Sequence, residues 1–257
     1  MTFADYPLWF IFAASLVVVL AAAEIGRRLA GRGKSERGDN VATLEAAILG
    51  LLALMISFTF AMALSRFEAR RDAILNEANA ISTTALRAKL LPAPSSEAVL
   101  NLLRDYLKVR LDITRRVLTR QDLETAVTKS IKIQQALWQQ AEELAAKNPA
   151  VVPTGLFIQS LNEMIDDQEK RVAAALNHLP DIVLVALYAV TTISIGFAGY
   201  AAGPNAQRSR LSVAIMSVLI CVVILLIQDI DRPSSGFVLV SQRPMLDAAA
   251  SLSSQAE

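Results

Sequence analysis

The sequence predicts an all-α membrane protein with four transmembrane helices and a helical-bundle domain inserted between the second and the third. Of its 257 residues, 54% are hydrophobic and 19% are charged, whereas a soluble domain has about 45–50% apolar and about 25% charged residues. The charges are concentrated between four apolar stretches, and each stretch approaches the roughly 20 residues with which a helix crosses a bilayer. This pattern excludes an ordinary soluble enzyme and a disordered chain.

The four apolar stretches are residues 8–23, 44–64, 182–202 and 211–227. The first is preceded by Asp5 and by no Lys or Arg, so we expect a retained anchor and not a cleaved signal peptide, which begins with positive charge. These stretches predict four segments: the first two transmembrane helices with a basic loop (1–65), an extramembrane helical bundle (66–180), the last two transmembrane helices (181–230) and a C-terminal tail (231–257).

The short loops carry the signal for orientation. Seven basic residues lie in the loops after the first and third spans: Arg27, Arg28, Arg32, Lys34, Arg37, Arg208 and Arg210. The opposite side carries as many, but long domains cross the membrane largely regardless of charge, so the short loops count for more. We therefore expect a multi-pass protein of the cell inner membrane with the 66–180 domain in the periplasm.

The second span is predicted to continue into the bundle as one helix. From Leu44 to Leu91 the chain has no proline and only one glycine, Gly50. Beyond the membrane, apolar residues recur at spacings of seven, four and three, which is typical of one helix face. Leu91-Pro92 ends this helix, because proline cannot continue it. Three further helices separated by prolines complete an antiparallel bundle.

Four polar residues of the bundle interrupt its apolar faces: Glu77, Asn79, Arg110 and Arg171. A carboxylate and an arginine on facing helices can form a bidentate pair. One interpretation is a structural clamp that fixes the register of the helices. The other is a ligand or ion site below the membrane.

The second span also carries a stripe that would line a pore: Glu45, Leu49, Leu52, Ile56 and Phe60. The stripe is mostly apolar, so in a pore it would form a hydrophobic constriction that gates by losing water. Packing against lipid or neighbouring helices explains the same stripe. Glu45, near the start of the helix, lies either at the headgroup level or at a functional position within the membrane.

Little in the sequence indicates catalysis or a bound cofactor. His178 is the single histidine and Cys221 the single cysteine, so neither a two-histidine metal site nor a disulfide can form within the chain. No nucleophile, base and orienting group converge, and the net charge is +1. We therefore expect a protein that is not an enzyme, without metal or cofactor and without a nucleic-acid partner.

Several short motifs resemble one family of bacterial membrane proteins. They include Glu77-Ala78-Asn79-Ala80-Ile81, Tyr106 followed by Arg110, Arg171 before Leu179-Pro180, and the tail Asp231-Arg232-Pro233-Ser234-Ser235-Gly236. As a set they are similar to the bestrophin-like domain-of-unknown-function family, over nearly the whole chain. The resemblance implies a four-span protein distantly related to bestrophin anion channels, which are pentamers lined by their second span. An acidic cluster like the calcium clasp of bestrophins is not evident.

Two functions remain open. The first is a homo-oligomeric ion channel for small ions, in which second spans surround an axis in the lipid bilayer. The second is a membrane-anchored sensory or scaffolding protein whose helical domain binds a ligand or partner. The uncharged spans suit the second, whereas the long continuous helix and the family resemblance favour the first.

Overall fold

The computed structural model describes residues 6–32, 39–115, 120–147, 152–203, 207–233 and 235–254. Residues 33–38 of the predicted basic loop, with Lys34 and Arg37, lie outside this description, whereas Arg27, Arg28 and Arg32 belong to the first helix. Every regular element in the described part is a helix, and four stretches are long and apolar enough to cross a membrane. The predicted all-α fold with four transmembrane helices is therefore confirmed.

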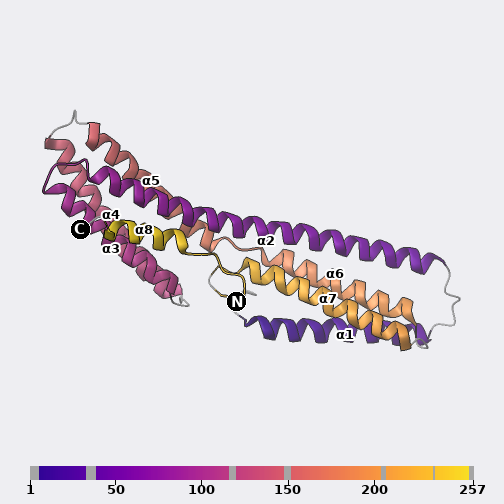
Figure 1. Ribbon diagram of the computed structural model, residues 1–257. Helices are drawn as coiled ribbons and strands as arrows, with labels where there is room; N and C mark the ends of the chain where they lie inside the picture. The colour runs from indigo at the N-terminus through magenta and orange to yellow at the C-terminus, as the bar shows by residue number, and fades with distance from the viewer. Residues whose placement is uncertain are drawn as a thin grey trace. The chain divides into compact units, whose positions relative to one another are not determined.

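The helices are α1 (Leu8–Arg32), α2 (Asp39–Ala88), α3 (Ser95–Arg115), α4 (Arg120–Lys147), α5 (Val152–Leu176), α6 (Asp181–Ala202), α7 (Gln207–Asp231) and α8 (Arg243–Ser254). Figure 1 shows α2 as one uninterrupted helix, as predicted, and it is 50 residues long. It ends at Ala88, just before Leu91-Pro92. Helix α5 begins at Val152, so Pro153 falls in its first turn, where a missing backbone N–H costs nothing.

Contacts divide the chain into two compact units. The membrane unit contains residues 1–66, 178–232 and 236–238, and the bundle unit contains residues 67–177, 233–235 and 239–257. Helix α2 belongs to both, because its first half is apolar and its second half is amphipathic.

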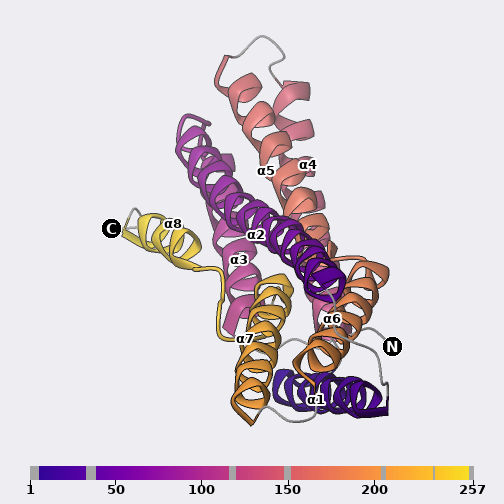
Figure 2. The ribbon, with the colours of Figure 1, turned by 90° about the vertical axis from the view of Figure 1, so that its right-hand side faces the viewer.

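In the membrane unit, α1, α6 and α7 pack against one another (Figure 2). The contact between α1 and α6 is tight because small residues face each other. A Cβ added to Gly26 would lie 1.9 Å from the carbonyl oxygen of Gly196, and one added to Gly199 would lie 2.1 Å from that of Ala23. Small residues of this kind let membrane helices approach to backbone contact.

Two buried aspartates at the end of α7 accept hydrogen bonds from backbone N–H groups of neighbouring segments. Asp229 accepts hydrogen bonds from the backbone N–H groups of Phe237 and Val238, at 2.8 and 2.9 Å. Asp231 accepts from the N–H of Leu179 at 3.0 and 3.1 Å. Gly236 lies beside Asp229 with a φ of 138°, a conformation that side chains disfavour.

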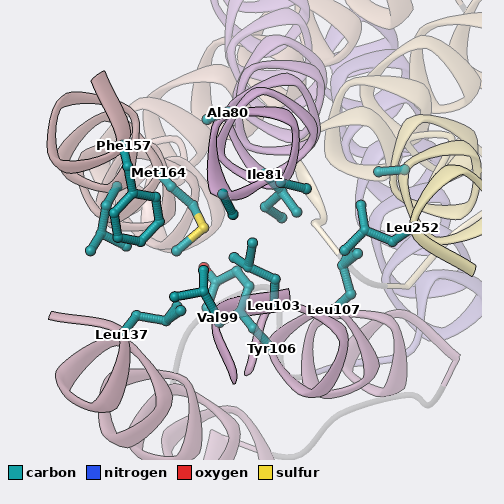
Figure 3. Packing of buried hydrophobic residues seen from close by; sticks show 14 of the residues in the cluster. Ala80, Ile81, Val99, Leu103, Tyr106, Leu107, Leu137, Phe157, Met164 and Leu252 are labelled. Carbon is teal, nitrogen blue, oxygen red and sulfur yellow. The ribbon is translucent and has the colours of Figure 1, made fainter. Parts of the chain in front are cut away.

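The bundle unit has one apolar core, built from the second half of α2 and from α3, α4, α5 and α8 (Figure 3). Its largest fully buried side chains include Tyr106, Leu103, Leu137 and Phe157. The predicted tail contributes to this core, because α8 packs against α3. The buried residues of α8 are Met245, Ala248 and Leu252.

Candidate functional site

The centre of the bundle holds a charged cluster formed by three helices. Glu77 is on α2, Arg110 on α3 and Arg171 on α5. All three side chains are buried, and Glu77 is 0% exposed. Each sits on an apolar helix face, so the packing that buries the neighbouring leucines also brings these charges together.

Glu77 is held by both arginines. Arg171 Nη1 donates to Oε2 at 2.7 Å, and Arg110 Nη2 donates to the same oxygen at 3.1 Å. Arg110 Nε lies 2.7 Å from Oε1 but is not aligned for a hydrogen bond. One carboxylate thus faces two guanidinium groups, and the cluster carries one net positive charge.

Uncharged polar groups extend this cluster. The Tyr106 hydroxyl lies 2.8 Å from Glu77 Oε1 and 3.1 Å from Gln168 Oε1. It has one proton to donate, and the charged carboxylate is the stronger acceptor. Gln134 Nε2 donates to Gln168 Oε1 at 2.8 Å, and Arg171 Nη2 donates to Gln242 Oε1 at 3.2 Å. The cluster therefore links α2, α3, α4 and α5 to the segment that precedes α8.

The arginines determine the ionisation of Glu77. Burial alone would raise the pKa of its carboxyl, but Arg110 and Arg171 together lower this pKa below its usual range. Burial and the neighbouring carboxylate raise the pKa of Tyr106 well above its usual value. At neutral pH the cluster therefore holds an ionised Glu77 and a protonated Tyr106.

The structure brings together three of the four polar residues that the sequence singles out. Asn79, the fourth, is exposed and points away from Glu77. It lines a groove of about 450 Å³ between α2 and α8, together with Leu75, Ser82, Leu86, Asp247 and Leu252. The burial of Glu77, Arg110 and Arg171 favours a structural clamp over a ligand or ion site.

Three glutamines of the cluster were not predicted from the sequence. Gln134 and Gln168 are polar residues on otherwise apolar helix faces, and this break in the apolar pattern could have identified them. Gln242 lies in the segment before α8, where no periodicity marks it. Within the described residues, no group of three or more His, Cys, Asp or Glu could hold a metal ion.

The candidate pore residues of α2 share one face, and that face is partly buried. Leu52 is only 2% exposed, next to the buried Thr59 and Ala63 on the same stripe. Glu45, Leu49, Ile56 and Phe60 are partly buried. The opposite face of α2 is open, and its large residues include Leu51, Leu54 and Phe58.

These features define a class: a multi-pass helical membrane protein whose second span continues into a bundle organised around a buried Glu–Arg cluster. A family model described as Bestrophin-like domain matches residues 12–245. The chain therefore belongs to the bestrophin-like family, which confirms the resemblance seen in the sequence.

Solved structures share this fold. A crystal structure of a bacterial bestrophin homologue from Klebsiella pneumoniae, in a variant form, matches with a TM-score of 0.71 at 13% identity, covering 97% of this chain and 98% of that one. The same homologue, phased with zinc, gives 0.63 at 16% identity, covering 95% and 99%. At such identities the likeness shows the fold alone. No curated protein matches the chain.

Proposed function

We propose that the chain is the subunit of a homo-oligomeric ion channel in which α2 helices surround a pore. The bestrophin-like family and fold support this assignment, because the sequence resemblance implies a relation to channels lined by the second span. The structural observation that supports a pore lined by α2 is the composition of the exposed face of this helix.

That open face combines bulky and small residues. Phe58 is 63% exposed and Leu54 is 52% exposed, while Gly50, Ser57 and Ser65 are exposed beside them. A Cβ added to Gly50 would meet nothing within 4 Å. A glycine within a helix costs about 1 kcal/mol relative to alanine, and no described residue comes close enough to Gly50 to require one. Close approach of an α2 helix from another subunit accounts for it.

The open face is also the better place for an apolar constriction. A side chain that lines a pore must remain uncovered by its own subunit, and Leu54 and Phe58 meet this condition. They lie one helical turn apart, so in a ring of subunits each would form one apolar layer. Ile56 and Phe60, on the more covered face, form the comparison pair.

Ion flux into reconstituted vesicles tests the proposal. Replacing Leu54 and Phe58 together by alanine widens the constriction, so we expect flux to rise severalfold. The Ile56→Ala/Phe60→Ala pair should instead open cavities and lower stability by about 2–5 kcal/mol per site. Val17→Ala/Ile25→Ala, at exposed positions of α1, is the control. Vesicles that stay ion-tight with a folded oligomer carrying the Leu54/Phe58 changes would contradict the channel.

Subunit number provides a second test. Gly50→Leu leaves the single chain undisturbed, because the position is open, but it should prevent close approach of neighbouring helices. We expect a ring of about five subunits for the wild-type protein by mass photometry in detergent, and smaller species for the variant. A monomeric wild type would favour the alternative function.

The alternative is a membrane-anchored sensory or scaffolding protein, and the groove between α2 and α8 favours it. Its exposed leucines, Leu75 and Leu86, could accept an apolar segment of a partner. Loss of partner binding in Leu75→Ser/Leu86→Ser, with ion flux absent throughout, would support this reading over a channel.

For orientation, we propose that the protein lies in the cell inner membrane with the bundle on the periplasmic side, as the basic residues of the short loops indicate. Alkaline phosphatase fused after Ser95 should then be active. Activity of β-galactosidase at the same position would place the bundle in the cytoplasm.

A further inference from the structure

A small hollow with charged walls lies where α1, α6 and α7 meet, in the membrane unit. Its volume is about 170 Å³. Leu20, Gly199 and Val213 form apolar parts of its wall, and Glu24, Arg27 and Arg210 form the charged part. The hollow therefore has one apolar side and one basic side.

The charged side sits at the membrane boundary. Arg27 follows the apolar stretch 8–23 by four residues, which is about 6 Å along a helix. Arg210 directly precedes the apolar stretch 211–227. Leu20 and Val213 lie inside these stretches, so the basic side is at headgroup level and the apolar side faces hydrocarbon.

The two arginines differ in how they are held. Arg27 is only 15% exposed and its Nε donates to Glu24 Oε2 at 2.9 Å. Glu24 thus fixes the guanidinium of Arg27 and leaves its Nη1 without a hydrogen bond to any described residue. Arg210 makes neither a hydrogen bond nor an ion pair with the described part of the chain. Two arginines against one carboxylate leave the hollow positively charged.

We propose that this hollow binds the phosphate of an anionic phospholipid, with the acyl chains lying along Leu20 and Val213. Guanidinium groups match phosphate oxygens in bidentate geometry, and basic pockets between transmembrane helices are suited to anionic headgroups. A free phosphate ion would use the same arginines but would gain nothing from the apolar wall. The hollow has room for several water molecules, and hence for one phosphate group.

Binding of defined lipids to the delipidated full-length protein tests this site. The probes are dioctanoyl phosphatidylglycerol, dioctanoyl phosphatidylcholine and inorganic phosphate, and the measurement is native mass spectrometry of lipid-bound species. We expect the wild-type protein to bind phosphatidylglycerol more tightly than phosphatidylcholine. In Arg27→Gln and in Arg210→Gln, the affinity for phosphatidylglycerol should be roughly five- to tenfold weaker. Arg210 is exposed and has no hydrogen bond or ion pair among the described residues, so Arg210→Gln should fold normally.

Arg28→Gln is the matched control. Arg28 is 72% exposed and does not line the hollow, although it neighbours Arg27 and also contacts Glu24. Its removal should change affinity less than twofold. An equal loss in all three variants would mean that a diffuse basic surface attracts lipid, and it would overturn the site. Displacement of the lipid by millimolar inorganic phosphate would overturn the assignment to a phospholipid.

Discussion

Arg171 Nη1 lies 2.7 Å from Glu77 Oε2, although the two residues are 94 positions apart in the sequence. This contact joins α5 to α2, the helix that continues from the membrane into the bundle. Arg110 adds α3 to the same carboxylate. The position of α2 within the bundle is therefore fixed by a charged contact as well as by apolar packing.

Replacing Glu77 by glutamine should destabilise the protein strongly. The change leaves two buried guanidinium groups without their counter-charge, and breaking a buried pair costs about 3–5 kcal/mol. We expect the melting temperature in detergent to fall by several degrees. Glu143→Gln, at an exposed position of α4, is the control and should melt like the wild type. Unchanged melting of Glu77→Gln together with altered ion flux would indicate a functional site instead of a clamp.

The stabilising effect of Glu77 should be lost in acid. Arg110 and Arg171 hold the folded pKa of Glu77 below its unfolded value, which is about 4.3 for a free glutamate. The contribution of Glu77 to the free energy of unfolding is therefore complete above that pH, and it disappears as the pH falls through the folded pKa. The difference in melting temperature between wild type and Glu77→Gln should shrink below about pH 4. A difference that stays constant from pH 7 to pH 3 would argue against this ionisation.

Tyr106→Phe isolates the hydroxyl that contacts Glu77. The ring and its packing remain, but Glu77 loses one buried donor, and we expect a cost of about 1–3 kcal/mol. The measurement is thermal unfolding in detergent. In a double-mutant cycle with Glu77→Gln the two effects should not add, because the residues share one hydrogen bond. Full additivity would show that the hydroxyl acts independently of the carboxylate.

Gly26→Ala should destabilise the membrane unit, whereas Gly155→Ala, in α5 of the bundle unit, should not destabilise the protein. A Cβ at position 26 would collide with the backbone of Gly196, so α1 and α6 must separate, at a cost of about 1–3 kcal/mol or more. A Cβ at position 155 would meet nothing within 4 Å, and alanine is the better helix former. Thermal unfolding in detergent should show a loss for Gly26→Ala and no loss for Gly155→Ala. Equal melting of both would mean that α1 and α6 do not pack closely in the membrane.

The helices and their membrane spans could be predicted because the causes are local. Four apolar stretches of bilayer length cross the membrane whatever their neighbours are. Likewise, the absence of proline between Leu44 and Leu91 suffices to keep α2 continuous. Helix α8 was not predicted, because a short amphipathic helix gains most of its stability from the core against which it packs.

Only the tertiary structure decided which polar residues meet. Glu77 and Asn79 look equivalent in the sequence, yet two residues along a helix turn a side chain by about 200°. Glu77 therefore enters the core while Asn79 faces the groove beside α8. The same holds for the second span: its periodicity marks a stripe through Leu52 and Ile56, and only the structure shows that Leu52 is buried while Ile56 is half-buried. Periodicity gives the faces of a helix, and the packing of distant helices determines which face is buried.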